Sequence, residues 1–504
     1  MSFVDDLKND EHVLTENGAI AYKTSGSYLV DLNFRIPSFR NKVDTSLFDL
    51  ALAEDERHTL KWLLYLRDIR GGMGERKSFR ELLVHLSNTK EDLCLKLLDN
   101  VDIAEYGRYD DLVYVIHNTK SNAVKRNCVV TISRQLSNDI ASEKQGKPCS
   151  LLAKWLPSEN ASSRKTKLMA REIRKELFLS SKDYRKILAK LRKHIDVVEV
   201  KMSSNNWDSI NYSSVPSKAN IRYYNAFMNH DYERFYNYVS AVTDGLEHIN
   251  ASALYLYDII NKYRNHGWYS STKDYDVVLE QLWKAQPNVD GFSDTLVMRD
   301  GSGSMTIRVS SSGVTASDVC DSLTLYASEH NVGEYANKFI TFGSNPSFVD
   351  LSGCTTLHDK LVTLAKYTDC SSTNIKKAFQ MVLHTAINHH TRKEDMPKRI
   401  LIISDMEFDA YGCIDDSDVS ATLFERISRA YNKYGYTMPK LVFWNVNSRT
   451  NSIPVHKTDA GIILVSGFSR NIMDMVLSDE ITPLKALLSI LDTKRYQAID
   501  KIYE

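Results

Sequence analysis

The sequence predicts a protein of two unlike parts, an all-α region followed by a doubly wound α/β domain. Between residues 45 and about 285, apolar residues recur at the spacing of one helix face, as at Phe79, Leu82 and Leu86. Beyond residue 290, short continuous apolar runs alternate with helical patterns. Such runs are typical of parallel strands that are buried on both faces of a sheet.

Changes in these patterns divide the chain of 504 residues. The first residues are polar and rich in turn formers, and the helical patterns that follow are separated only by short breaks such as Gly71–Gly74 and Pro157. We expect an irregular N-terminal segment at 1–44, a helical array at 45–290, the α/β domain at 291–480 and a C-terminal helix at 481–504. The expected strands are Thr295–Met298, Phe339–Phe342, Ile400–Ile403, Leu441–Val446 and Ile462–Val465.

Charge and cysteine content limit the class of protein. Lys+Arg and Asp+Glu are equal at 64 each, so overall charge gives no attraction to nucleic acids or membranes. The seven cysteines form no C-x-x-C pair, which favours a reducing compartment. No secretory leader pattern and no run of about 18 apolar residues is found. The expectation is a cytoplasmic protein that is not a membrane protein.

Three polar loops follow or precede elements of the predicted sheet. They are Asp300-Gly-Ser-Gly-Ser304 after the first strand, Ser371–Asn374 before a helix, and Ser404-Asp405 after a later strand. Ligands of open α/β sheets bind at the carboxyl ends of the strands, so we expect these loops to converge. Two carboxylates and several hydroxyls are hard oxygen ligands, which suit Mg²⁺, Mn²⁺ or Ca²⁺ better than zinc.

This pattern resembles the metal-ion-dependent adhesion site of von Willebrand factor A domains. In those domains D-x-S-x-S is followed by a loop threonine and a strand-end aspartate. The resemblance implies a Rossmann-like domain whose cation, most simply Mg²⁺, keeps one coordination position open for an acidic side chain or a phosphate oxygen of a partner. The implied metal ligands are Asp300, Ser302, Ser304, Thr373 and Asp405.

Alternatives remain for this stretch. The glycines could form a simple turn with hydroxyls that cap helices, or a metal could only stabilise the loops. A serine nucleophile is disfavoured because the stretch is not G-x-S-x-G. Arg299 departs from the family pattern, in which this residue is usually apolar. We expect Arg299 to pair with a neighbouring acid such as Glu407. Its positive charge near the site would weaken cation binding.

The helical half carries a second resemblance. The stretch RDIRGGMGER at 67–76 is similar to a segment of the family known as domain of unknown function 2828. Further similar stretches are YGRYDD at 106–111, AKWLP at 153–157, YSSVPS at 212–217, LVFWNVN at 441–447 and VSGFS at 465–469. That family is similar in layout to the Ro (TROVE) ribonucleoproteins, in which HEAT-like helices that bind RNA precede a von Willebrand A domain. The arginines beside the glycines could bind an anion, but we favour a turn in which they pair with Asp68 and Glu75.

A basic segment gives independent support for RNA. Residues 163–193 hold twelve Lys and Arg against three acidic residues. The candidate RNA-binding residues are Arg164, Lys167, Arg171, Arg174, Lys175, Arg185, Lys186, Lys190, Arg192 and Lys193. The nearby aromatic residues Trp155, Tyr184, Trp207 and Tyr212 could stack on bases. The alternative is a solvated helix face with the aromatic residues in the core.

The sequence therefore predicts a non-enzymatic binding protein. Its helical part would bind RNA, and its α/β part would bind a divalent cation and through it an acidic ligand. The alternative is a metal-dependent protein scaffold or assembly factor that binds no RNA. A third hypothesis, a metal-dependent hydrolase or nuclease, needs a base near the cation, for which Glu407 and Asp409 are the candidates.

Overall fold

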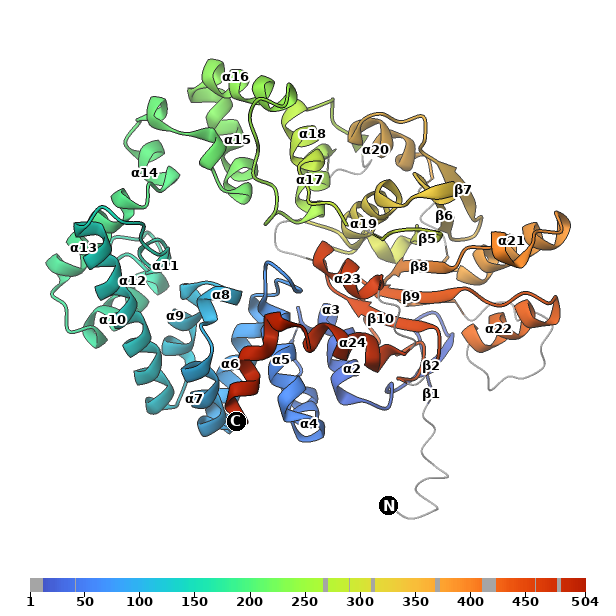
Figure 1. Cartoon of the computed structure of the whole chain (residues 1–504), viewed down its shortest axis with the longest axis horizontal. Helices are drawn as coiled ribbons and strands as arrows, with labels where there is room; N and C mark the ends of the chain where they lie inside the picture. The colour runs from blue at the N-terminus through green and yellow to red at the C-terminus, as the bar shows by residue number, and fades with distance from the viewer. Residues whose placement is uncertain are drawn as a thin grey trace, which may run out of the picture. The chain divides into compact units, whose positions relative to one another are not determined.

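The computed structural model describes residues 12–40, 42–265, 271–289, 291–309, 313–367, 372–409, 423–457, 459–477 and 482–504. The chain forms two compact units. One comprises residues 1–58 and 248–492, and the other comprises residues 59–247 and 493–504. Figure 1 shows helices along the first half of the chain and strands that alternate with helices along the second. The predicted order, a helical region followed by an α/β sheet, is confirmed.

The helical unit consists of helices joined by short loops. They are α5 (Glu56–Arg67), α6 (Lys77–Thr89), α7 (Glu91–Asn100), α8 (Ile103–Tyr106), α9 (Tyr109–Asn118), α10 (Asn122–Lys144), α11 (Leu152–Trp155), α12 (Arg164–Glu176), α13 (Ser181–His194), α14 (Val198–Ser203), α15 (Ser217–His230) and α16 (Tyr232–Thr243). Serine hydroxyls cap several N-termini, such as Ser121 Oγ, which accepts a hydrogen bond from Val124 N at 3.0 Å. No helix in the described part of the chain is long and apolar enough to cross a membrane.

The glycine-rich turn after α5 is a structural corner. A Cβ on Gly72 would lie 2.1 Å from the Tyr65 carbonyl oxygen, so only glycine fits there. Buried Arg67 pairs with Asp111 at 2.8 Å rather than with Asp68. Asp68 instead accepts a hydrogen bond at 2.8 Å from Nε of Arg495, which lies in the 3₁₀ turns Lys494–Ile502. The stretch is thus a glycine-rich turn, as interpreted from the sequence, but Arg67 takes its carboxylate partner from α9.

The α/β unit contains a six-stranded sheet in the order β10-β9-β8-β5-β6-β7. Its strands are β5 (Thr295–Asp300), β6 (Lys338–Phe342), β7 (Ser347–Asp350), β8 (Arg399–Ser404), β9 (Lys440–Asn445) and β10 (Ile462–Ser466). The five predicted strands are all present and parallel. Strand β7, which the sequence did not predict, is antiparallel to β6 at the sheet edge. Its Phe348 is half exposed, so the strand lacks the continuous apolar run used for prediction.

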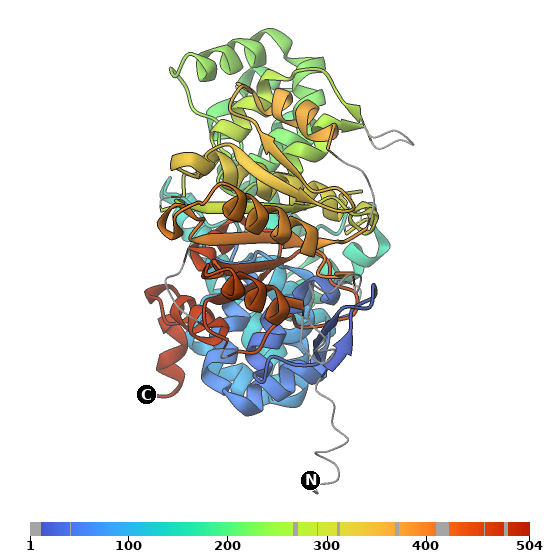
Figure 2. The same ribbon diagram turned by 90° about the vertical axis from the view of Figure 1, so that its right-hand side faces the viewer.

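Every residue of the central strand β5 is buried, which shows that both faces of the sheet are covered there. Helix α19 packs on β5, β6 and β8, whereas α2, α23 and α24 pack on β10. The helices of this unit are α2 (Tyr28–Phe34), α3 (Ile36–Phe39), α4 (Thr45–Glu54), α17 (Leu256–Tyr263), α18 (Val277–Lys284), α19 (Ala316–His330), α20 (Leu357–Ala365), α21 (Ile375–Asn388), α22 (Leu423–Lys433), α23 (Met473–Val476) and α24 (Pro483–Leu491). Figure 2 shows the same ribbon, with the strands of the sheet, after a quarter turn about the vertical axis.

The two chain ends differ from the sequence-based boundaries. Within 1–44 the described residues form a hairpin of β1 (His12–Leu14) and β2 (Ile20–Tyr22), followed by α2 and α3. Asn445 Nδ2, at the end of β9, donates a hydrogen bond to the Phe34 carbonyl at 2.9 Å. The final segment is not one helix, because α24 ends at Leu491 and 3₁₀ turns follow from Lys494. The partners of both ends lie hundreds of residues away, where no local pattern reveals them.

Candidate metal centre

Two of the candidate ligands lie at the switch point of the sheet. From β5 the chain continues to β6 on one side, and it later returns to β8 on the other side. Asp300 ends β5 and Asp405 follows β8, and the register pairs Arg299 with Ile403. The carboxyl ends of two adjacent parallel strands that diverge in this way form the usual ligand crevice of open α/β sheets.

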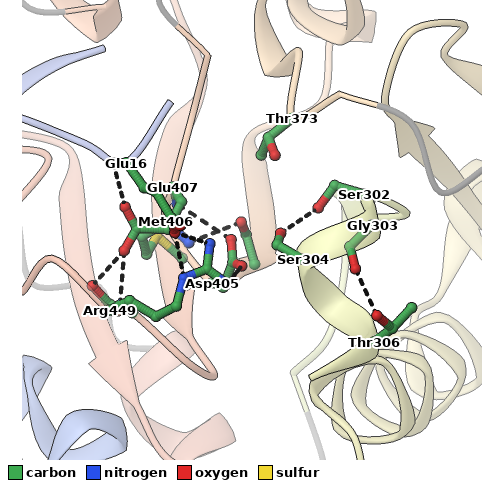
Figure 3. Close-up of polar contacts among 12 residues, drawn as sticks. Glu16, Ser302, Gly303, Ser304, Thr306, Thr373, Asp405, Met406, Glu407 and Arg449 are labelled. Atoms are coloured by element: carbon green, nitrogen blue, oxygen red, sulfur yellow. Dashed lines mark hydrogen bonds and ion pairs between the residues drawn. The ribbon is translucent and has the colours of Figure 1, made fainter. Parts of the chain in front are cut away.

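Asp300 is buried and held by the loop that follows it and by the end of β8. Its Oδ1 accepts a hydrogen bond from Ser302 N at 2.9 Å, and its Oδ2 accepts one from Ser404 Oγ at 2.5 Å. Burial raises the pKa of Asp300 above its usual range, even though these hydrogen bonds favour the charged form. The hydroxyls of Ser302 and Ser304 lie 2.9 Å apart (Figure 3). Two hydroxyls and a carboxylate are therefore gathered in one short loop.

Asp405 is equally buried and only partly satisfied. Its Oδ1 accepts a hydrogen bond from Glu407 N at 3.2 Å. Its Oδ2 has no hydrogen-bond partner among the described residues, and the nearest cation is Arg449 Nη1 at 3.4 Å. Burial and repulsion from Asp300 raise the pKa of Asp405 to about 7. A cation or a proton shared by the two carboxylates would stabilise this arrangement, because Asp405 Oδ2 is buried without a hydrogen bond.

Thr373 completes the set of oxygen atoms. It lies in the loop before α21 and is buried. Figure 3 shows Thr373, Ser302, Ser304 and Asp405 around one space. In the described part of the chain no group of three or more His, Cys, Asp or Glu side chains is arranged to hold a metal ion. A cation at this point would therefore depend on hydroxyl oxygens as well as on the two carboxylates, and the residues present fit a hard divalent ion.

Arg299 does not pair with Glu407, contrary to the sequence-based expectation. Its Nε lies 2.5 Å from Asp321 Oδ1 on α19, and Asp321 also contacts Arg264. Although burial opposes ionisation, the two guanidinium groups lower the pKa of Asp321, so the pair is ionised. Helix α19 packs on β5 and brings this acid to the arginine. The charge of Arg299 is thus neutralised within the sheet layer.

Glu407, proposed from the sequence as a catalytic base, is fully engaged. Its Oε1 accepts hydrogen bonds from Arg449 N at 2.7 Å and Thr450 N at 2.9 Å. Its Oε2 accepts one from Glu16 N at 2.8 Å. These contacts tie the loop after β8 to the loop after β9 and to the N-terminal hairpin. Glu407 therefore connects these loops to one another.

The basic residues on α12 and α13 fall into two groups. Three are bound within the unit: Arg174 pairs with Glu159 at 2.9 Å, Lys190 pairs with Glu143 at 2.5 Å, and Arg192 Nε donates to the Ala153 carbonyl at 2.8 Å. The others have no carboxylate partner among the described residues and are exposed, apart from half-buried Lys167: Arg164, Lys167, Arg171, Lys175, Arg185, Lys186 and Lys193. The spacing of Arg164, Lys167, Arg171 and Lys175 places them on one face of α12.

The aromatic residues suggested for base stacking are mostly engaged. Tyr184 is buried and donates to the Pro157 carbonyl at 2.8 Å, and Tyr212 is buried with its hydroxyl on Asp231. Arg108 covers the ring of Trp155 at 3.8 Å, and Trp207 stacks on His230. Phe178, which sequence reasoning missed, is 96% exposed at the end of α12 with a φ of 53°. No sequence signal separates this phenylalanine from a core residue.

Two family models and one relative match the chain. The model described as "Domain of unknown function (DUF2828)" matches residues 117–290, and "Domain of unknown function (DUF7788)" matches residues 294–496. "Uncharacterized protein L728" of Acanthamoeba polyphaga mimivirus is 30% identical over 518 aligned residues. The alignment covers 95% of this chain and 87% of that protein.

Proposed function

The chain belongs to the domain of unknown function 2828 family, and from this premise we propose that it is a non-enzymatic, Ro-like binding protein. Its α/β unit binds a divalent cation and through it an acidic ligand, in the manner of a von Willebrand A domain. Its HEAT-like helical unit binds RNA. The two activities rest on different residues and can be tested separately.

The pair of buried carboxylates at the switch point carries the first part of the proposal. Asp405 Oδ2 lacks a hydrogen bond and faces the charge of Asp300. Asp300, Ser302, Ser304, Thr373 and Asp405 would hold the cation, with Mg²⁺ preferred and Mn²⁺ or Ca²⁺ as alternatives. Because three of these ligands carry no charge, the bound ion would stay electrophilic toward an incoming carboxylate. Neutralisation of Arg299 by Asp321 at 2.5 Å removes the main objection to a cation here.

Cation binding is tested with Mn²⁺ and electron paramagnetic resonance on the full chain. The wild type is expected to bind one Mn²⁺, and Asp300→Ala and Asp300→Asn to lose it, because a buried charged ligand disappears. Mg²⁺ should compete with Mn²⁺ and raise the unfolding temperature of the wild type alone. Asp395→Ala is the control, since this carboxylate pairs with Arg392 in an exposed turn. Equal Mn²⁺ binding by Asp300→Ala and wild type would refute the site.

The second part of the proposal rests on the exposed face of α12 and α13. Exposed cations without carboxylate partners attract phosphates, and exposed Phe178 offers a stacking face. A bulky residue with a φ of 53° is held in a conformation that side chains avoid. Phe178 therefore replaces the buried tyrosines as the best candidate for contact with a base.

RNA binding is tested by gel shift with a single-stranded RNA of mixed sequence. The triple variant Arg164→Glu, Arg171→Glu and Lys175→Glu should lower the affinity at least tenfold and flatten its salt dependence, since about 0.7 counterions are released per phosphate contact. Phe178→Ala should weaken binding by about 1–3 kcal/mol at every salt concentration. The control variant reverses three charges with Arg392→Glu, Lys393→Glu and Lys398→Glu, which are exposed in the α/β unit, and should leave the affinity for RNA unchanged. No gel shift by the wild type would favour the alternative, a protein scaffold without RNA.

The surroundings of Glu407 disfavour it as one of the two candidate bases of the hydrolase alternative. Both of its carboxylate oxygens already accept hydrogen bonds, from Arg449 N, Thr450 N and Glu16 N. A general base needs an oxygen that can reach the proton of the attacking water. We therefore keep binding, rather than hydrolysis, as the proposed activity of this site.

A further inference from the structure

The turn of the N-terminal hairpin is attached to the candidate metal centre. Thr15 Oγ1 donates to the Phe408 carbonyl at 2.6 Å, and Asn17 Nδ2 donates to the Glu407 carbonyl at 2.6 Å. The same amide nitrogen lies 3.3 Å from the hydroxyl of Thr373, a candidate cation ligand. The hairpin between β1 and β2 thus reaches the rim of the site from the far end of the sequence.

One residue of this turn is a carboxylate that pairs with a site arginine. Glu16 Oε2 forms an ion pair with the Nε and Nη2 atoms of Arg449. The third nitrogen, Nη1, lies 3.4 Å from Asp405 Oδ2. Figure 3 shows Arg449 between the hairpin and Asp405. Glu16 is half exposed, so a second carboxylate can approach the same guanidinium group.

A basic cavity adjoins this arginine. Its volume is about 450 Å³, and its lining includes Arg35, Lys42 and Arg449. Asp44 is the single carboxylate in this lining, and it already caps α4 by accepting a hydrogen bond from Leu47 N at 3.0 Å. Arg35 Nε is buried without a hydrogen-bond partner among the described residues. Arg35 and Lys42 have no carboxylate partner among the described residues, and Arg449 is paired with Glu16 and Asp405. The three cations together make the cavity suitable for an anion.

We propose that Arg449, with Arg35 and Lys42, binds carboxylates of the acidic ligand, and that Glu16 occupies Arg449 as a competitor within the chain. This inference rests on the proposed function of the cation site and names its ligand as an acidic peptide segment. One carboxylate of that segment would reach the cation, and its neighbours would displace Glu16 and enter the basic cavity. Carboxylate is favoured over phosphate because the chain itself places a glutamate on Arg449.

The test measures binding of fluorescein-labelled hexaglutamate to the full chain by anisotropy, with Mn²⁺ present. Arg449→Met should weaken binding about tenfold, because a charge-assisted bidentate contact is lost. Glu16→Gln should strengthen it about threefold, because the competing carboxylate is removed while the backbone contact from Glu16 N to Glu407 remains. The double variant should behave like Arg449→Met alone.

The controls use the exposed pair of Arg392 and Glu394, whose charged atoms lie 3.6 Å apart. Arg392→Met and Glu394→Gln should leave hexaglutamate binding unchanged. If Arg449→Met does not fold, Arg449→Lys and Lys42→Gln replace it, and each should weaken binding.

Mn²⁺ titration of the same variants separates the two levels of the proposal. If the wild type binds no Mn²⁺, the proposed function fails. If Mn²⁺ binds normally but Arg449→Met and Glu16→Gln bind hexaglutamate as the wild type does, the carboxylate receptor is refuted. Displacement of hexaglutamate by inorganic phosphate at lower concentration than by glutarate would overturn the assignment to carboxylates.

Discussion

At the scale of single residues, burial decides the chemistry of the candidate site. Asp300 and Asp405 are both completely buried, and their charges repel each other. Arg299 is also buried, but it forms an ion pair with Asp321. The two aspartates at the strand ends have Arg449, 3.4 Å from Asp405, as a nearby cation, so a bound metal ion or a proton would neutralise the remaining negative charge.

The raised pKa of Asp405 gives a prediction about pH. Because its pKa is about 7 in the folded chain and about 3.9 in unfolded chains, the folded state holds the proton more tightly. The stability that this proton contributes is complete below about pH 4 and is lost as the pH rises through 7. Without a divalent cation, the unfolding temperature should fall between pH 5 and pH 8.

Cation binding should show the opposite dependence. The ligand must lose its proton, so Mn²⁺ affinity should rise about tenfold per pH unit below pH 7 and then level off. Asp405→Asn should reduce the fall in stability of the metal-free protein between pH 5 and pH 8, as followed by circular dichroism, while buried Asp300 continues to titrate. A stability that is independent of pH in the wild type would contradict the assignment.

At the scale of elements, distant segments complete each unit. Strand β5 and helix α19 bring Arg299 to Asp321, and the loop between β1 and β2 meets the loop after β8. In the helical unit, Arg495 lies between Asp68 and Glu105, with Nε 2.8 Å from Asp68 Oδ2 and Nη1 2.9 Å from Glu105 Oε1. The chain end is therefore part of the corner formed by the glycine-rich turn.

This contact predicts that the chain end stabilises the helical unit. Arg495→Ala should cost about 1–3 kcal/mol, because it leaves buried Asp68 with fewer partners while Arg495 itself is partly exposed. Hydrogen exchange of amides in α5 and α6 should rise roughly tenfold or more. Arg392→Ala is the control and should change stability by less than about 0.5 kcal/mol. Unchanged protection in α5 would contradict this role of Arg495.

At the scale of the whole molecule, periodicity was enough to predict the class of each region. Continuous apolar runs identified the five parallel strands, because strands covered on both faces have no polar side. The half-exposed edge strand β7 and the N-terminal hairpin have no such signature. Both are short antiparallel pairs of neighbouring strands, and their mixed burial leaves no continuous apolar run to identify them.

The order of strands and loops in the sequence was enough to predict that Asp300, Ser302, Ser304 and Asp405 lie at one edge of a sheet, because the carboxyl ends of parallel strands meet at the same edge. Thr373 directly follows no parallel strand, so its place beside them depends on how α21 packs on β6. The partners of the charges around these residues are likewise set by tertiary packing. The contacts of Arg299 with Asp321, Glu16 with Arg449 and Asn17 with Thr373 join residues 22, 433 and 356 positions apart. Such pairs follow from how helices and loops pack on the finished sheet, and no local pattern encodes them.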